Sequence, residues 1–184
     1  MEEIITSRLS LRLMTADFLE ASLSGDVKKN ESLIGLKISQ DWLDENDLSR
    51  LRLGDYRRDA EYILWGLRAI GLKESNEMVG FIGFHTRPNP QYLQKYAPHA
   101  IEFGYTIFFQ NRRQGFAEEA LIGLMNWAID QYPLENFIAS VSPTNIASTA
   151  MIKKLKFEKV AEQMDEVDGL EFVYQLSVKK LKSL

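Results

Sequence analysis

The stretch from residue 100 to residue 131 constrains the fold most, because in it a strand leads through a glycine into a helix. Residues 100–109, AIEFGYTIFF, are rich in aromatic and β-branched side chains, which predicts a strand. After Gly115 the apolar residues recur at the spacing of one helical face: Ala117, Ala120, Leu121, Leu124, Met125, Ala128 and Ile129.

The rest of the chain supplies a hairpin before this stretch and further strands and helices around it. Thr15 offers a cap for a helix that begins near Asp17. Strands are expected at residues 8–13, 62–70, 78–86, 136–142, 157–163 and 170–178, and helices at 39–53 and 145–155. A hairpin followed by strand, helix, strand and helix predicts an α/β (α+β) fold, with a mixed central sheet of about six to seven strands flanked by helices.

The composition is that of an ordinary globular protein, and we expect a single domain over residues 1–184. No apolar run approaches the roughly 18 to 20 residues that span a bilayer, and the first residues are unlike a signal peptide, so a cytoplasmic location is expected. The chain has no cysteine and only two histidines, which predicts no disulfide and no metal site. A net charge of −4 argues against a nucleic-acid partner.

The residues around Gly115 have the chemistry of an anion site. A helix start presents unpaired backbone N–H groups, glycine allows close approach, and Arg112 and Arg113 add positive charge. Residues 103–117 contain no acid, and Glu118 and Glu119 can point to the opposite side of the helix. A plain connection with exposed arginines is the alternative reading of these residues. The glycines in GFIG, residues 80–83, lie inside a predicted strand and start no helix.

Three ordered segments resemble the GNAT family, the acetyl-coenzyme A-dependent N-acetyltransferases. RRQGFA, residues 112–117, is similar to the family's Q/R-x-x-G-x-G/A loop. TSRLSLRLMTADF at 6–18, IEFGYTIFFQNRRQGFAEEAL at 101–121 and ASVSPTNIASTAMIKKLKF at 139–157 resemble the RimJ/RimL-type branch, which acetylates ribosomal-protein N-termini and other amines.

The resemblance implies where acetyl-coenzyme A binds. The loop would hold the pyrophosphate on its backbone N–H groups, and the pantetheine arm would run at the splay between the central strand and the next parallel strand. The residues implied are Arg112, Arg113, Gln114, Gly115, Phe116 and Ala117 for the pyrophosphate, Ile107, Phe108 and Phe109 for the arm, and Asn145 and Ser148 beyond the next strand. Lys153 and Lys154 are either partners of the outer phosphate or solvated lysines. Gly115 is expected to need unusual backbone angles or close approach to phosphate.

The implied reaction is direct transfer of acetyl to an amine, which needs a base because an alkyl amine is mostly protonated at neutral pH. Glu102 is the first candidate, as a half-buried carboxylate with a raised pKa, and His85 is the second. A backbone N–H near Phe109 would stabilise the oxyanion. Many family members carry a tyrosine seven residues after the asparagine; here Ile152 stands there, so Ser148 is the candidate acid.

Two further points concern the turn after the last predicted helix and the acceptor. Lys156 replaces the family's common glycine, at a cost of about 1 kcal/mol if the turn is left-handed.

Trp42, with His85 and Tyr105, is expected to contact the acceptor. Its acidic neighbours either attract a cationic amine or form a solvated helix face: Asp41, Asp44 and Glu45.

Several alternatives stay open at this stage. The acceptor is a protein N-terminus, a polyamine, an amino acid or an antibiotic, and the chain is a monomer or a homodimer without membrane partners. A non-catalytic module that senses acetyl-coenzyme A is the competing function. A hydrolase is unsupported, because the sequence has neither G-x-S-x-G nor a cysteine nucleophile.

Overall fold

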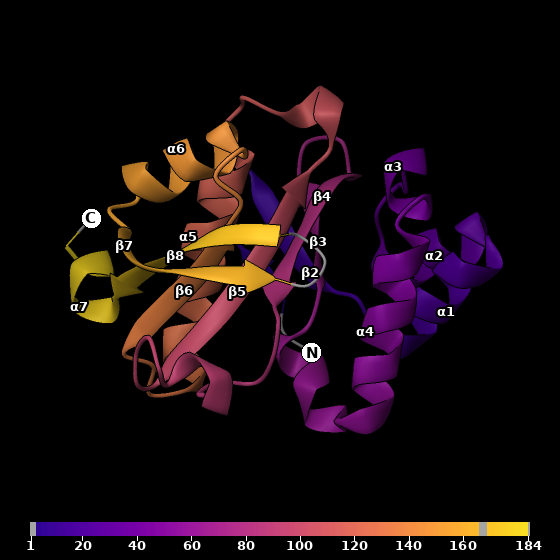
Figure 1. Ribbon diagram of the computed structural model, residues 1–184. Helices are drawn as coiled ribbons and strands as arrows, with labels where there is room; N and C mark the ends of the chain where they lie inside the picture. The colour runs from indigo at the N-terminus through magenta and orange to yellow at the C-terminus, as the bar shows by residue number, and fades with distance from the viewer. Residues whose placement is uncertain (1–2, 166–168, 184) are drawn as a thin grey trace. The chain divides into compact units, whose positions relative to one another are not determined.

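The computed structural model describes residues 3–165 and 169–183 (Figure 1). The chain forms two compact units: Met1–Phe84 with Tyr105–Leu124, and His85–Gly104 with Met125–Leu184. Strand β5 (Ala100–Ile107) and helix α5 (Phe116–Gln131) each begin in one unit and end in the other. The expected single domain over 1–184 stays a prediction.

The first unit contains a sheet and a group of helices. Its strands are β1 (Ile4–Ile5), β2 (Leu9–Leu13), β3 (Arg68–Leu72), β4 (Glu77–Phe84) and the end of β5. Its helices are α1 (Ala16–Ser24), α2 (Val27–Ile34), α3 (Gln40–Leu43), α4 (Asn46–Arg58), η1 (Ala60–Trp65), η3 (Phe109–Asn111) and the start of α5. Strands β1 to β4 pair antiparallel in chain order, which confirms the predicted hairpin.

Local signals set the helix ends in this unit. Thr15 accepts a hydrogen bond from the N–H of Phe18 and begins α1, as predicted, and Gly25 ends α1 in the left-handed conformation. The strand predicted at residues 62–70 is wrong in its first part. Asp59 accepts a bond from the N–H of Glu61 and starts the 3₁₀ helix η1, so the strand begins only at Arg68.

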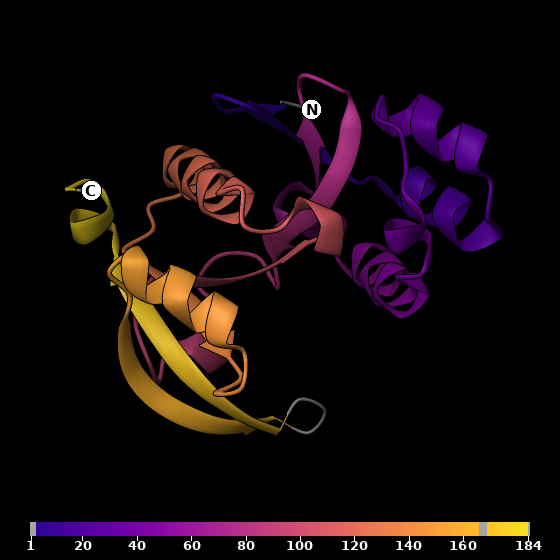
Figure 2. The ribbon, with the colours of Figure 1, turned by 90° about the horizontal axis from the view of Figure 1, so that it is seen from above.

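A chain of aromatic rings forms the core of the first unit. Phe18 and Trp42 have ring centroids 5.7 Å apart, Trp42 and Phe81 5.6 Å, and Phe81 and Phe108 6.3 Å. These contacts tie α1 and α3 to the sheet, and Figure 2 shows the helices α1 to α4 gathered on one side of the β3–β4 hairpin. Gly80 lets β4 approach β5 closely, because a Cβ there would lie 2.2 Å from the carbonyl oxygen of Thr106.

The second unit is a smaller mixed sheet with helices. It contains the start of β5, η2 (Gln91–Leu93), β6 (Asn136–Val141), α6 (Ile146–Lys154), β7 (Glu158–Asp165), β8 (Gly169–Ser177) and α7 (Val178–Leu181). Strands β5 and β6 are parallel from the pair Ala100 and Asn136 to the pair Glu102 and Ile138. Strand β6 then pairs antiparallel with β8, and β8 with β7.

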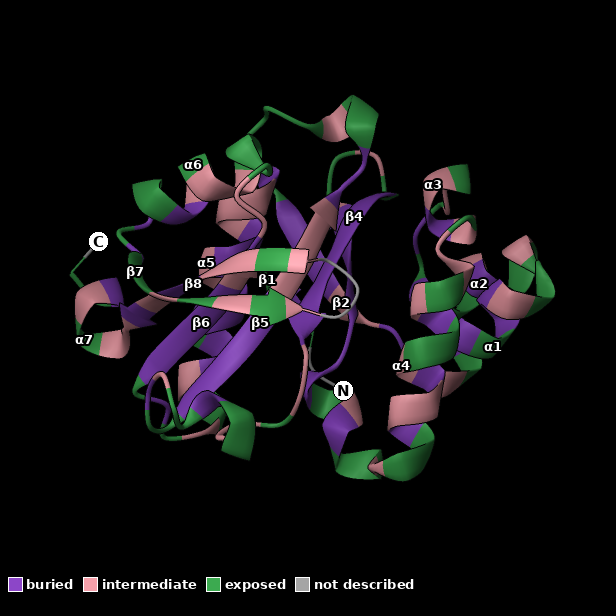
Figure 3. Ribbon diagram, viewed as in Figure 1, coloured by how far each residue is buried: buried purple, intermediate pink, exposed green. Residues whose placement is uncertain are grey.

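The core of the second unit lies around the parallel pair. Buried residues from η2, β5, β6 and β8 pack together there: Leu93, Ala97, Ala100, Ile138 and Val173. Figure 3 shows β5 and β6 buried over most of their length. The mixed α/β fold class is confirmed, with eight strands among the described residues where six to seven were expected. No helix within the described ranges is long and apolar enough to cross a membrane.

Candidate active site

The loop between η3 and α5 contains two residues with a positive φ angle. Arg113 has φ 62° and Gly115 has φ 80°, so two residues of this turn are left-handed, and the expectation of unusual angles at Gly115 is confirmed. The N–H of Glu119 donates to the carbonyl of Gly115, and α5 then continues for 16 residues. The N–H groups that precede Glu119 in the first turn therefore lie at the positive end of a long helix.

The loop's arginines are exposed but differ in their contacts. Arg112 donates from Nε to the carbonyl oxygen of Ile107 at 2.9 Å, and its guanidinium lies 5.6 Å from the ring centre of Phe109. Phe109 is 79% exposed, which makes it an apolar surface beside the loop. Arg112 thus links the turn to the end of β5. The backbone of Arg113 is left-handed.

Part of the backbone assigned to the pantetheine arm is already hydrogen-bonded. The N–H of Phe108 donates to the carbonyl of Val79 at 3.0 Å, and the carbonyls of Phe108 and Phe109 accept from η3. The side chains of Ile107 and Phe108 are buried. The N–H of Phe108 is therefore already used, since its hydrogen bond to Val79 continues the contact of β4 with β5, and the assignment of Ile107, Phe108 and Phe109 to the arm stays a prediction.

Arg8, which the sequence did not single out, holds the loop from the start of β2. Its Nη1 donates to the carbonyl oxygen of Gln114 at 2.9 Å, and its guanidinium lies 4.7 Å from the ring centre of Phe116. Its Nε forms an ion pair of 2.7 Å with Glu119. Thr6 and Arg8 therefore fix the direction of the Glu119 carboxylate, on the side of α5 that faces Arg8.

The electrostatics of Glu119 follow from these contacts. Burial raises the pKa of its carboxyl, but donation from Thr6 and Arg8 and the charge of Arg8 together lower that pKa below its usual value.

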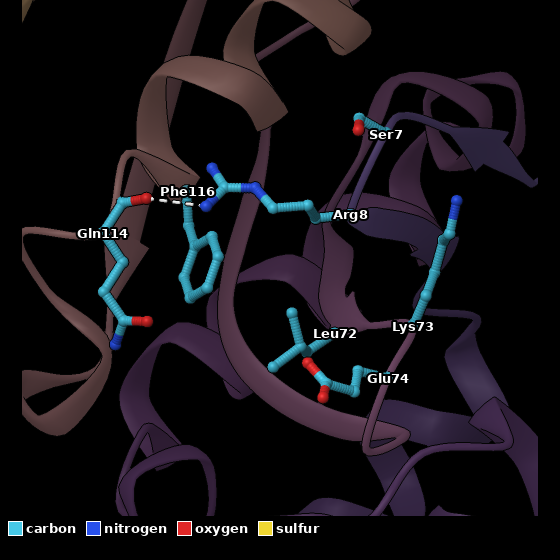
Figure 4. A pocket seen from close by; sticks show the side chains of 7 residues that line it. All are labelled: Ser7, Arg8, Leu72, Lys73, Glu74, Gln114 and Phe116. Carbon is cyan, nitrogen blue, oxygen red and sulfur yellow. Dashed lines mark hydrogen bonds between the residues drawn. The ribbon is translucent and has the colours of Figure 1, made fainter.

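A cavity of about 420 Å³ lies beside the loop. Figure 4 shows the side chains that line it. The residues that line it are Ser7, Arg8, Leu72, Lys73, Glu74, Gln114 and Phe116.

In the second unit, Glu102 is the centre of a polar cluster. It is only 6% exposed, and its carboxylate accepts from Ser140 Oγ at 2.5 Å and from Tyr92 Oη at 2.8 Å. His85 Nδ1 lies 3.7 Å from Glu102 Oε2. Ser140 reaches the carboxylate because it lies two residues after Ile138, the strand partner of Glu102, and so points to the same face.

The pKa of Glu102 is lowered, which corrects the expectation of a raised one. Burial does raise it, but hydrogen bonding and charge from His85, with donors Ser140 and Tyr92, outweigh that effect. The sequence did not identify Ser140 or Tyr92, which lie 38 and 10 residues from Glu102 along the chain. This glutamate is held as a carboxylate by its donors, so it is a weak proton acceptor.

His85 lies between the backbone of β5 and the carboxylate. The backbone N–H of His85 donates to the backbone carbonyl of Glu102 at 2.9 Å, and the His85 side chain is 39% exposed. A Cβ on Gly104 would lie 2.7 Å from His85 Nε2, so the glycine makes room for the ring. The imidazole thus lies beside the Glu102 carboxylate and is partly open to solvent.

Asn145 and Ser148 lie together at the start of α6. Asn145 is the N-cap, and its Oδ1 accepts from the N–H of Ser148 at 3.1 Å. Ile152, at the position of the family's tyrosine, is fully buried, which explains why an apolar residue fits there. Lys156 ends this helix with φ 64°, so the left-handed turn expected of a glycine forms with lysine instead. Lys153 and Lys154 are exposed.

The predicted acceptor residues have different outcomes. Trp42 is fully buried and donates from Nε1 to Ser22 Oγ at 2.9 Å, so its expected contact with an acceptor is wrong. Its large ring fills the core between α1 and β4. Asp41, beside it, accepts a hydrogen bond from Gln110. Tyr105 is half-buried on β5, and its role stays a prediction.

Comparisons with known proteins show which family and fold this chain shares. Over 97 residues, the chain is 30% identical to the uncharacterised N-acetyltransferase YoaA of Bacillus subtilis (strain 168), a match that spans 53% of this chain and 49% of that protein. The chain thus matches about half the length of such curated relatives.

Solved structures share the fold at low identity. RimJ of Mycobacterium smegmatis, in complex with CoA-disulfide, superposes with a TM-score of 0.62 at 16% identity, over 94% of this chain and 83% of that one. The ribosomal-protein-S5-alanine acetyltransferase of Vibrio fischeri gives a TM-score of 0.63 at 14% identity, over 96% and 97%.

A model of the acetyltransferase (GNAT) domain matches residues 8–158. This match includes β2, the loop before α5, Glu102, and the cap of α6. The chain therefore belongs to the GNAT family of acetyltransferases.

Proposed function

We propose that this protein is an acetyl-coenzyme A-dependent N-acetyltransferase that moves the acetyl group directly to a primary amine. The observation that carries the proposal is the turn ahead of α5, in which Arg113 and Gly115 are both left-handed. Successive N–H groups in such a turn, together with the helix dipole, favour an anion such as a pyrophosphate. The loop's positive charge, from Arg112 and Arg113, suits the same ligand.

The residues present fit coenzyme A as a substrate. Gly115 has no side chain to block approach, and a Cβ placed there would meet only Arg8 Nη2, at 3.4 Å. The backbone of Phe109 and the exposed ring of its side chain remain candidates for contact with the pantetheine arm. Asn145 would contribute through its amide nitrogen, because its oxygen caps α6.

Proton transfer is assigned to His85, with Glu102 as its positioning residue. A carboxylate that accepts from Tyr92 and Ser140 and has a lowered pKa is a poor base. The same carboxylate would fix the orientation of His85 and stabilise its protonated form. The amine would lose its proton to the imidazole as it attacks the thioester carbonyl. Glu102 acting through water is the second candidate.

The leaving thiolate needs a hydrogen-bond donor, and Ser148 is the proposed one. It lies in the first turn of α6 and is half-buried. A hydroxyl there can donate to sulfur as negative charge develops. The cytoplasmic location and the oligomeric state remain predictions.

The test is release of free thiol from acetyl-coenzyme A with a panel of amines. The panel includes a peptide beginning with alanine, because a similar fold belongs to an enzyme named for alanine of ribosomal protein S5. A polyamine, amino acids and an aminoglycoside complete it. Amine-dependent thiol release supports the enzyme. Binding of acetyl-coenzyme A without turnover on any amine would favour the sensor, and no binding would contradict both.

A further inference from the structure

The opening motif TSRLSLR has two arginines with separate tasks. Arg12 donates from Nη1 to the carbonyl oxygens of Ile34 and Gly35, at 3.1 and 2.6 Å, and so holds the C-terminal end of α2. Arg8 reaches in another direction, to the loop and first turn of α5. The proposed function uses neither arginine, although the motif carries part of the family resemblance.

The contacts of Arg8 fix the orientation of one peptide group in the loop. Its Nη1 donates to the carbonyl oxygen of Gln114 (Figure 4). In a trans peptide the C=O of one residue and the N–H of the next point in opposite directions. Holding the Gln114 oxygen toward Arg8 therefore turns the N–H of Gly115 the other way.

Arg8 and Thr6 also control the charge of Glu119. One carboxylate oxygen accepts from Thr6 Oγ1 at 2.6 Å and from the Arg8 N–H at 2.7 Å, and the other accepts from Arg8 Nε at 2.7 Å. The Glu119 side chain is only 17% exposed, and these donors hold it in place. Without Arg8, an unpaired negative charge would lie in the first helical turn, where an anionic ligand is expected.

We propose that Arg8 is a positioning residue for the coenzyme A loop: it orients the peptide of Gln114 and Gly115 and neutralises Glu119. This inference rests on the proposed binding of acetyl-coenzyme A. It deepens that proposal, because it assigns part of the affinity to an arginine that lies more than a hundred residues before the loop in sequence. Thr6 supports Arg8 by fixing the same carboxylate.

The test compares Arg8→Met with Arg12→Met by calorimetry with acetyl-coenzyme A. Methionine keeps an unbranched stem, which preserves packing over Phe116, but removes the donors and the charge. We expect Arg8→Met to weaken binding about tenfold, the scale of one charge-assisted hydrogen bond. With an accepted amine, kcat at saturating acetyl-coenzyme A and KM for the amine should stay unchanged. Arg12→Met should lower Tm and leave the affinity intact.

A second pair of variants tests the charge. Glu119→Gln should bind at least as well as the unaltered protein, and the double variant Arg8→Met/Glu119→Gln should bind more tightly than Arg8→Met alone. If the unaltered protein binds but Arg8→Met binds equally well, or if Arg12→Met weakens binding as much, the inference is overturned. A double variant no tighter than Arg8→Met would overturn the charge argument. If the unaltered protein itself does not bind, the proposed function has failed instead.

Discussion

Glu102 illustrates how neighbours decide what a carboxyl group can do. Burial alone would raise its pKa and make it a better base. Tyr92 and Ser140, from η2 and β6, donate to it and hold it ionised, with His85 beside it. With these donors, Glu102 is better suited to orient the imidazole of His85 than to accept a proton itself.

The two assignments predict different losses in activity. His85→Gln should lower kcat by about 100-fold, the scale of general base catalysis, because the proton acceptor is removed. Glu102→Gln should lower kcat by about tenfold, because the imidazole stays but loses its orienting charge. The measurement is initial rate against pH with an accepted amine, and the His85→Gln deficit should shrink at high pH, where the amine deprotonates unaided. A larger loss in Glu102→Gln than in His85→Gln would reverse the assignment.

At the scale of elements, the turn before α5 combines two left-handed residues with a long helix. Gly115 adopts φ 80° without strain, whereas any residue with a Cβ is disfavoured there, β-branched residues most of all. Gly115→Val should therefore weaken binding of acetyl-coenzyme A by at least tenfold while the fold is retained, as checked by calorimetry and circular dichroism. Gly25→Val is the matched control for backbone strain, because Gly25 ends α1 with φ 71° and a Cβ placed there has no atom within 4 Å. Unaltered affinity in Gly115→Val would contradict the pyrophosphate assignment.

The end of α6 carries strain that the sequence itself revealed. Lys156 has φ 64°, its N–H donates to the carbonyl of Lys153, and the N–H of Phe157 donates to Ile152. This is the usual hydrogen bonding of a helix that ends on a left-handed residue, a place where glycine is favoured.

Lys156→Gly should stabilise the protein by about 0.5 to 1 kcal/mol, because glycine has no Cβ and adopts the left-handed backbone conformation without steric strain. Denaturant unfolding measures the change, with Ala150→Gly, an exposed position inside the same helix, expected to destabilise by about 1 kcal/mol. A loss of stability in Lys156→Gly would show that the lysine side chain stabilises the turn by other contacts.

For the whole molecule, most strands and the two helices that flank β6 could be predicted, because hydrophobic period and caps are local properties of the chain. Helix α2 was not predicted, and the helix predicted at 39–53 forms as α3 and α4. Thr15 and Gly115 act within a few residues of their own positions. One wrong prediction was decided locally, since Asp59 starts η1 where a strand was expected. For the others, distant partners decided the outcome. Trp42 is buried because Phe18 and Phe81 surround it. The direction of the Glu119 carboxylate is also set by distant residues, Thr6 and Arg8. The lowered pKa of Glu102 likewise depends on residues from other elements.

Because the pKa of Glu102 is lowered, the free energy of unfolding should depend on pH. A carboxyl whose pKa is lower in the folded than in the unfolded state adds stability above the unfolded value, and this contribution is lost as pH falls through the folded value. Glu102→Gln removes the charge but keeps a similar shape. At pH 7 it should reduce the free energy of unfolding by about 1 to 3 kcal/mol, the scale of hydrogen bonds to a buried charge.

Urea unfolding at a series of pH values checks this sign. In a His85→Gln background, where no imidazole titrates beside the carboxylate, the effect of Glu102→Gln should be constant from pH 7 to about pH 5. It should shrink below the usual glutamate pKa near 4.3, because the unfolded carboxyl binds a proton there while the folded one stays ionised until a lower pH. Glu119→Gln is a useful comparison, since Glu119 also has a lowered pKa but is more exposed, so its pH-dependent part should be smaller. A difference for Glu102→Gln that stays constant down to pH 3 would mean that this carboxyl has the same pKa in both states, and that Tyr92 and Ser140 do not hold it ionised.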